Sequence, residues 1–188
     1  MDASVKKSDD DATVHAVVSK IRMDTLSILW TTQFPVLHSS GSTKKEAASA
    51  ALGCAVIPGK GRIYVAGDVE KGATLENSKS FGGDDIFVSL VETETGSKIW
   101  TKQHGSNGDD RIARGKGIAC DANGNAVVYG DTTGNFYRIM KKNQQSEKHK
   151  SDIFMMYFDQ QDGSHQPSLS KQSSKPKEGS ESIASPSE

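Results

Sequence analysis

The residues whose types and spacing point most clearly to a binding site are acidic and amide side chains between positions 105 and 125. Asp109-Asp110 is followed by Asp121-Ala-Asn-Gly-Asn125. Clustered carboxylate and amide oxygens on loops are the ligands that Ca²⁺ requires. The second segment, however, lacks the glycine at the sixth position of an EF-hand loop, and Asp or Asn before Gly is ordinary in hairpin turns. We therefore expect turn residues here, and the candidates for a calcium site are Asp109, Asp110 and Asp121.

Other side chains that could bind or catalyse have no arrangement that favours such chemistry. Trp30 and Trp100 could stack on a sugar or a cofactor, but their positions in two similar segments favour packing between repeats. The five histidines show no metal-ligand spacing. There is no glycine-rich phosphate loop, no Gly-x-Ser-x-Gly motif and no Cys/His pairing. We expect no catalytic residue and no cofactor.

Several polar residues and both cysteines have a structural explanation beside a functional one. Asp68 and Asp131 each follow a strand-end glycine and could line a channel, but turn capping is the explanation that we favour. The lysine-rich segment 138–150 could contact anionic lipid or nucleic acid, but a solvated loop accounts for it. Cys54 and Cys120 lack the Cys-x-x-Cys spacing of a zinc or redox site, and we expect both to be small buried strand residues.

Composition limits the partners and leaves the compartment open. The chain has 188 residues, a net charge of −1, and only 34% hydrophobic and 6% aromatic residues, which is lean for a fully packed domain. The balanced charge argues against nucleic acid as a partner. No run of 18 apolar residues is available for a transmembrane helix, and the N-terminal residues lack the apolar segment of a secretory signal.

Both ends of the chain are polar and are expected to be disordered. Residues 159–188 include nine serines and three prolines but only three residues of the hydrophobic set. Such a segment cannot bury enough apolar surface to offset its ordering entropy. Residues 1–12 are similarly polar. The sequence therefore predicts a folded region over 13–158.

Internal repetition is the strongest structural signal. Ile28-Leu-Trp-Thr-Thr-Gln33 is echoed further along the chain by Lys98-Ile-Trp-Thr-Lys-Gln103, which places the only two tryptophans at equivalent positions. At the same offset 15–21 is echoed by 85–91, which is echoed again by 152–158, and a further echo relates 61–68 to 124–131. Each unit is typical of four short strands separated by turn residues.

Tandem four-stranded antiparallel units are the blades of a β-propeller. We therefore predict an all-β partial propeller, with blade one at 13–68, blade two at 85–131 and the first strand of a third blade at 152–158. One segment departs from the strand pattern. Thr43-Lys-Lys-Glu46 has the spacing of a capping box and precedes an alanine-rich stretch that stops at Gly53, which predicts a short helix between the second and third strands of the first unit.

The second unit resembles the SBBP-type bacterial β-propeller repeat, which also occurs in eukaryotic surface proteins. The resemblance covers 85–131, and the first unit keeps less of it. The residues of the repeat signature are Trp30, Gly53, Gly67, Asp85, Trp100, Gly105, Gly108, Gly117, Gly124, Asn125 and Gly130. The resemblance implies a propeller wall without catalytic residues, in a larger cell-surface or secreted protein. A competing resemblance links Leu90–Trp100 to the tryptophan-docking segment of quinoprotein-type repeats, which would imply an oxidoreductase or an assembly scaffold.

From these signals we expect a non-enzymatic module that offers a binding or scaffolding surface to a protein partner or to further blades. The segment Ile153-Phe-Met-Met-Tyr-Phe158 has six apolar residues in a row, a pattern that suits a strand buried on both faces. In a third blade that stops after one strand, this segment would be an open hydrophobic edge. We therefore expect self-association through 153–158, unless the strand pairs back onto a blade of its own chain.

Overall fold

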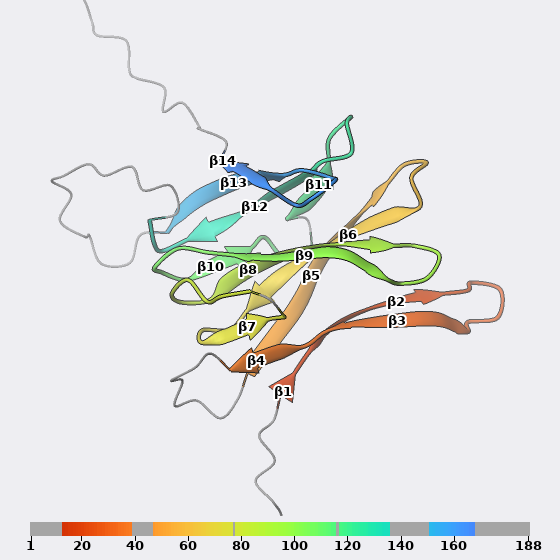
Figure 1. Cartoon of the computed structure of the whole chain (residues 1–188), viewed down its shortest axis with the longest axis horizontal. Helices are drawn as coiled ribbons and strands as arrows, with labels where there is room; N and C mark the ends of the chain where they lie inside the picture. The colour runs from red at the N-terminus through yellow and green to blue at the C-terminus, as the bar shows by residue number, and fades with distance from the viewer. Residues whose placement is uncertain (1–12, 39–46, 77, 116, 136–150, 168–188) are drawn as a thin grey trace, which may run out of the picture.

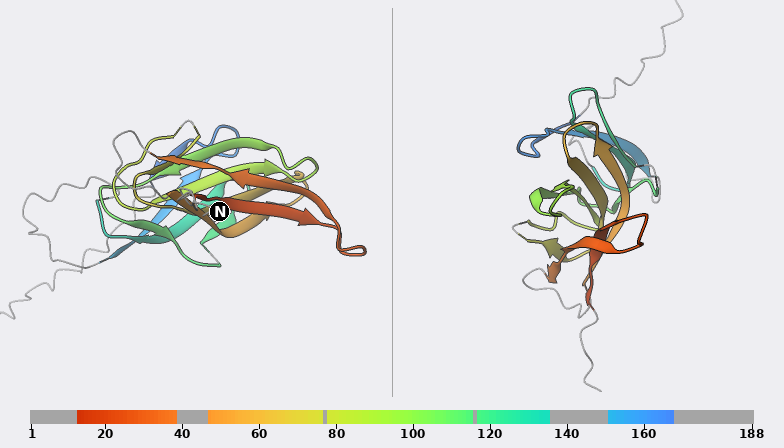
Figure 2. Two further views of the ribbon diagram at one scale, coloured as in Figure 1. Left: turned by 90° about the horizontal axis from the view of Figure 1, so that it is seen from below. Right: turned by 90° about the vertical axis from the view of Figure 1, so that its right-hand side faces the viewer.

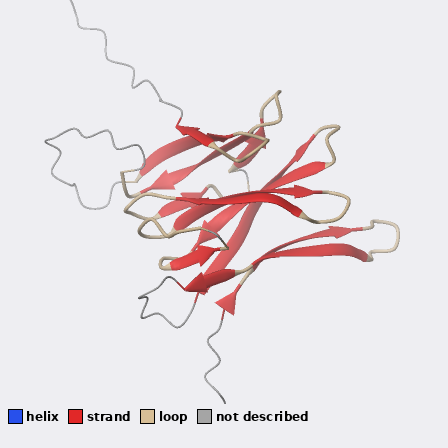
Figure 3. Cartoon of the chain, in the orientation of Figure 1, coloured by secondary structure: helices blue, strands red, loops and turns tan. Residues whose placement is uncertain are grey.

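The computed structural model describes residues 13–38, 47–76, 78–115, 117–135 and 151–167, and every regular element within them is a β-strand (Figures 1 and 3). The all-β prediction is confirmed. The sequence segments 1–12 and 168–188, for which disorder was predicted, and the lysine-rich segment up to Lys150 lie outside the described residues.

The strands form three layers that follow one another in chain order (Figure 1). The first layer is the antiparallel hairpin of β2 (Ala16–Ile21) and β3 (Ile28–Phe34). The central layer has the order β5 (Ala47–Ile57), β6 (Arg62–Val69), β8 (Asp85–Glu92), β9 (Lys98–His104), and β1 (Thr13–Val14) lies parallel to β5. In the third layer, β12 (Ala126–Thr132) pairs with β10 (Asp110–Ile112), β11 (Ile118–Cys120) and β13 (Asp152–Phe158), and β14 (His165–Pro167) pairs with β13. A separate small sheet consists of β4 (Val36–His38) and β7 (Ala73–Leu75).

The central layer is covered on both faces, and the outer layers lie on opposite sides of it (Figure 2, right). Toward the first layer, Phe87 of β8 packs against Phe34 of β3, with ring centroids 5.2 Å apart. Toward the third layer, Ile86 and Leu90 pack in one cluster with Phe154 and other apolar residues of β12 and β13. Burial on both faces explains why Ile-Phe-Val-Ser-Leu-Val in β8 is almost continuously apolar.

The grouping of strands into sheets differs from the predicted blades. The four strands of residues 13–68 do not form one sheet, because β2 and β3 pair only with each other while β5 and β6 join β8 and β9. Likewise, the strands of 85–131 are divided between the central and third layers. Each four-stranded set thus combines the last two strands of one sequence unit with the first two of the next. The sheets therefore begin and end two strands away from the predicted blade boundaries, since β6 of the first unit pairs with β8 of the second.

Two further expectations are wrong. The capping box at 43–46 lies outside the described residues. The alanine-rich stretch after it, which was predicted to be helical, is the first half of β5, because its pairing with β6 outweighs the local helix propensity of alanine. The predicted tail does not begin at Asp159, since residues 159–164 form a turn and β14 pairs with the end of β13. The third unit therefore has two strands in the described chain, and β13 pairs with β12 along its whole length and with β14 at its last three residues.

The three hairpins of the repeat have closely related geometry. Ile21 pairs with Ile28, Val91 with Lys98 and Phe158 with His165, and these pairs stand at the same offsets as the echoes in the sequence. The first two hairpins also share a register shift one residue before this pair. Equivalent positions can therefore be compared from layer to layer.

Candidate functional site

Each tryptophan joins its own hairpin to the turn of the next one. The indole Nε1 of Trp30 donates to the carbonyl of Thr93 at 3.1 Å, and that of Trp100 donates to the carbonyl of Gln160 at 3.1 Å. A Cβ at Gly96 would lie 2.7 Å from Trp30 Cδ2, and one at Gly163 would lie 2.8 Å from Trp100 Cδ2. We call this arrangement the tryptophan–turn contact. It places both tryptophans between successive layers, where each packs against the turn of the next hairpin.

The residues of the tryptophan–turn contact are replaced in the two outer layers of the described chain. In the turn of the first hairpin, Leu26 stands at the position of Gly96 and has the same left-handed backbone, with φ of 53° against 76°. Its side chain is 74% exposed. At the other end, Pro167 of β14 stands at the position of Trp100 in β9. A further hairpin at either end would therefore meet no tryptophan and no glycine of this kind.

One outer surface of the stack is the outward side of β13 and β12. Ile153 is 85% and Tyr157 39% exposed, and Met155 and Tyr129 are cross-strand neighbours on the same side. We call these four residues the β13 face. At the equivalent positions of β8, Ile86 and Leu90 are fully buried. The expectation that 153–158 is buried on both faces is therefore wrong, because no layer of the described chain follows the third one.

The other outer surface is the outward side of the first hairpin. Val17 and Ile21 are 49% and 48% exposed. We call this pair the β2 face. The equivalent residues of β8, Phe87 and Val91, are fully buried under the first layer. The stack thus ends in two exposed faces whose equivalents inside the molecule are layer interfaces.

The three calcium candidates do not form one site. Asp110 begins β10 and pairs with Thr132, whereas Asp121 lies in the turn before β12, so they are at opposite ends of that strand. Asp121 Oδ1 accepts hydrogen bonds from the backbone N–H groups of Asn123 (2.9 Å) and Asn125 (2.8 Å), which lower the pKa of its carboxyl. Asp109 Oδ1 accepts from the backbone of Asp84 at 3.2 Å. Asp110 and Asp121 accept from backbone N–H groups within four residues, as turn residues do, whereas the backbone partner of Asp109 is 25 residues away.

Two buried carboxylates, Asp85 of the repeat signature and Asp110, lie beside the loop between β9 and β10. Asp110 accepts from the backbone N–H and, at 3.0 Å, the hydroxyl of Ser106. Asp85 Oδ2 accepts from Gln103 Nε2 at 2.8 Å and from the backbone of Phe81 at 3.0 Å. Asp85 Oδ1 is a buried atom that faces Gly105 and has no hydrogen-bond partner among the described residues. Burial raises the pKa of both carboxyls. A Cβ at Gly105 would collide with Asp85 Oδ1, so backbone fills the space in front of this oxygen.

The other signature residues lie where backbone segments approach closely. A Cβ at Gly67 would collide with the carbonyl of Ala50, and one at Gly130 with that of Arg111. Gly124 adopts a left-handed φ of 88° in its turn, as hairpin turns require. The remaining signature residues sit in the packed loops and in the sheets: Gly53 in β5, Gly108 beside Gly134, Gly117 against Ile112, and Asn125, whose Oδ1 accepts from the backbone of Gln160 at 3.2 Å.

Asp68 and the cysteines have structural surroundings. Asp68 Oδ1 accepts from the backbone N–H of Ile112 at 2.8 Å and so joins the central layer to β10, and burial raises the pKa of its carboxyl to about 6. Asp131 is exposed on β12. The expectation that both cysteines are buried is wrong for Cys54, which is exposed, and Cys120 is partly buried.

Sequence reasoning missed the β2 face, because only the layer order shows that no described layer covers Val17 and Ile21.

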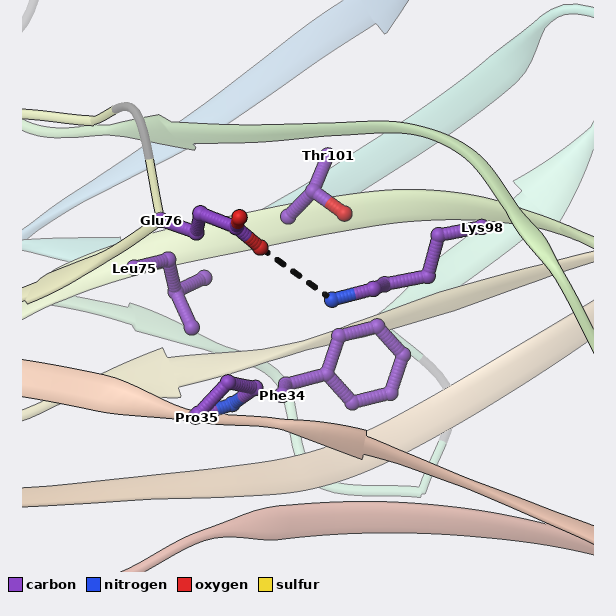
Figure 4. Close-up of a pocket in the computed structure, with 6 residues that line it drawn as sticks. All are labelled: Phe34, Pro35, Leu75, Glu76, Lys98 and Thr101. Carbon is purple, nitrogen blue, oxygen red and sulfur yellow. Dashed lines mark ion pairs between the residues drawn. The ribbon is translucent and has the colours of Figure 1, made fainter.

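A groove of about 250 Å³ lies between the end of β3, β7 and β9 (Figure 4). The Lys98 ammonium is 3.8 Å from a Glu76 carboxylate oxygen across it, and Phe34, Pro35, Leu75 and Thr101 complete the lining. This volume is below the usual range of about 300–1,000 Å³ for small-molecule sites, and the lining offers no nucleophile beside a base.

The part of the chain that the structure describes contains no group of three or more metal-binding side chains. None of its elements is a helix long and apolar enough to cross a membrane. Comparison with protein-family models and with curated proteins finds no match to this chain.

Proposed function

We propose that this chain is a non-enzymatic β-propeller repeat module of the SBBP type that acts as a binding or scaffolding surface for protein partners. The observation that carries the proposal is the pair of exposed end faces. Residues of the β13 face and the β2 face are exposed where their equivalents in the central layer are fully buried. Exposed apolar surface that matches an internal interface is typical of a protein-interaction site.

The arrangement of the layers supports the propeller assignment. Successive layers are joined by the same tryptophan–turn contact, and each complete set of four strands draws on two sequence units. Closed propellers typically have four to eight such blades, so a module of this size would act within a larger assembly. A cell-surface or secreted setting is what the family resemblance implies for it.

The experiment is a capture comparison with variants at the end faces. Immobilised wild-type chain, Ile153→Lys, Val17→Lys and the control Val56→Lys are exposed to the same extract, and bound proteins are quantified. Val56 is an exposed residue of the central layer. We expect a set of proteins that is lost with Ile153→Lys or Val17→Lys and kept with Val56→Lys. Equal capture by all four chains would contradict the proposal.

A quinoprotein-like oxidoreductase is the second candidate, and the specific observation in its favour is the docking of Trp100 against the turn at Gln160 and Gly163. Its test is reconstitution with a quinone cofactor and Ca²⁺, followed by absorbance and dye-linked dehydrogenase measurements. A bound quinone spectrum together with dye reduction would favour the enzyme over the scaffold.

A further inference from the structure

The interior of the molecule shows what covers a surface like the β13 face. In the repeat, Ile86, Val88 and Leu90 of β8 are the equivalents of Ile153, Met155 and Tyr157, and they are packed against the third layer. The cover there consists of inward residues of β13 that include Phe154 and Phe158. Inside the molecule, the side of a layer that corresponds to the β13 face is therefore covered by the inward side of the next layer.

Among the described residues, the β2 face is an uncovered surface of that matching kind. Val17 and Ile21 of the β2 face are equivalent to Phe87 and Val91, which pack against the preceding layer, and Phe87 is in turn equivalent to Phe154. The β2 face thus lies on the side that receives a preceding layer, and the β13 face lies on the side that receives a following one. The two faces are at opposite ends of the stack (Figures 1 and 2).

We propose that the chain binds a second copy of itself head to tail, with the β13 face of one copy against the β2 face of the next. The inference rests on the proposed function and names the partner. Contact between two different surfaces leaves one free surface at each end, so association extends to chains or closes into a ring. The layer order of the propeller would then continue from one copy into the next.

The contact joins faces and not strand edges. β12 pairs with β13 along its whole length and β14 pairs with residues 156–158, so only the first half of β13 has an edge without a partner strand among the described residues. The junction also lacks the tryptophan–turn contact, since Leu26 replaces the glycine and β14 has no tryptophan. We therefore expect association between copies to be reversible on dilution, in contrast to the packing of layers within one chain.

The experiment uses sedimentation velocity on the full chain over a hundredfold range of concentration. The β13-face variant is Ile153→Glu with Tyr157→Glu, the β2-face variant is Val17→Glu with Ile21→Glu, and Val56→Glu is the control. Tryptophan fluorescence and thermal unfolding establish that each variant is folded. Should a double variant fail to fold, the single changes Ile153→Lys and Val17→Lys replace it.

Head-to-tail association predicts that the wild-type chain and the control form oligomers, that each face variant alone is monomeric, and that an equimolar mixture of the two variants stops at a dimer. A β2-face variant that still dimerises alone would show β13 faces binding each other and would overturn the proposal. A monomeric wild-type chain at every concentration would also overturn it.

The same results separate this inference from the proposed function. A monomeric wild-type chain that still captures proteins through its end faces would leave the scaffold proposal standing and remove only the second copy as the partner. A monomeric chain without face-dependent capture would remove both.

Discussion

Single glycines set the distance between layers where a tryptophan lies against a turn. Gly96 combines two requirements, because its φ is 76° and the ring of Trp30 occupies the space where a Cβ would stand. Gly115 has nearly the same φ, 77°, but nothing lies within 4 Å of its Cβ position. The two residues therefore separate the cost of the backbone conformation from the cost of the collision.

We expect Gly96→Ala to destabilise the fold more than Gly115→Ala. Alanine in the left-handed region costs about 1–2 kcal/mol, and overpacking against the indole adds roughly 1–3 kcal/mol. Urea unfolding followed by tryptophan fluorescence measures both variants. Equal losses of unfolding free energy would mean that Trp30 moves away without cost.

His104 makes stability depend on pH in the mildly acidic range. Its ring lies 4.1 Å from that of His165, and burial lowers its pKa to about 4. Because the unfolded histidine has a pKa near 6.5, the unfolded state binds more protons between these values, and stability falls as pH falls from about 6.5 to 4. Relative to His104→Asn, we expect the wild-type chain to lose up to about 2 kcal/mol over this window. Parallel curves of unfolding free energy against pH would exclude the effect.

Asp68 has the opposite pH dependence. Its pKa of about 6 is above the unfolded value near 3.9, so its folded form holds a proton more tightly and stability falls as pH rises through this window. Asparagine keeps an oxygen for the Ile112 N–H and carries no charge. We expect Asp68→Asn to gain roughly 1–2 kcal/mol on the wild-type chain between pH 4 and 7, after allowance for partial exposure. Denaturant melts at pH 4 and 7 test this, and a constant difference would show that Asp68 stays charged at both.

At the scale of elements, equivalent strands differ because of what lies beside them. Ile86 and Ile153 occupy the same position of the repeat, but the first is fully buried and the second is largely exposed. We expect Ile86→Ala to cost about 2–5 kcal/mol and Ile153→Ala less than about 0.5 kcal/mol. Chemical denaturation below the concentration at which copies associate gives both values. A large loss at Ile153 would mean that its face is covered within the same chain.

The sequence was sufficient for the strands of the repeated segments but not for their assignment to sheets. Alternation, turn glycines and the constant offset between the tryptophan segments predicted short strands in the repeated segments 15–21, 28–33, 85–91 and 98–103, and local chemistry determines such elements. The pairing of β6 with β8 is non-local. The repeated segments have the same sequence pattern whether a strand pairs within its own unit or with a strand of the next unit, so the pattern does not show which strands share a sheet. The helix expected before Gly53 failed for a related reason, because pairing with β6 overrides alanine's preference.

The candidate site was only partly predictable for the same reason. A packing role for Trp30 and Trp100 followed from their repeated positions. Exposure of Val17 and Ile153 did not, because apolar residues in a strand pattern indicate burial without saying whether a neighbouring layer exists. The signature glycines and Asp85 were found as a pattern, and only the close backbone approaches explain them.

At the scale of the whole molecule, the stack behaves as a series of nearest-neighbour contacts. The central layer is held on both sides, whereas each outer layer is held on one. Local opening should therefore be easiest at the ends, as in other repeat proteins. The β13 face and the β2 face, which we propose as binding surfaces, therefore lie on the layers that open most easily.

The central layer contains strands from both sides of the segment 76–84, so non-covalent contacts join the two parts of the chain. Eight residue pairs join β6 to β8, so the halves before and after the segment 76–84 are held by a ladder of hydrogen bonds and by two apolar clusters. We expect the chain cut in this segment to stay assembled, and two separately expressed fragments to recover the tryptophan emission of the intact protein on mixing. Gel filtration of the nicked chain measures this, and separate elution of the pieces would contradict it. Peptide-bond connection between the halves would then serve to raise their local concentration, and the segment could accept an inserted domain or a split reporter.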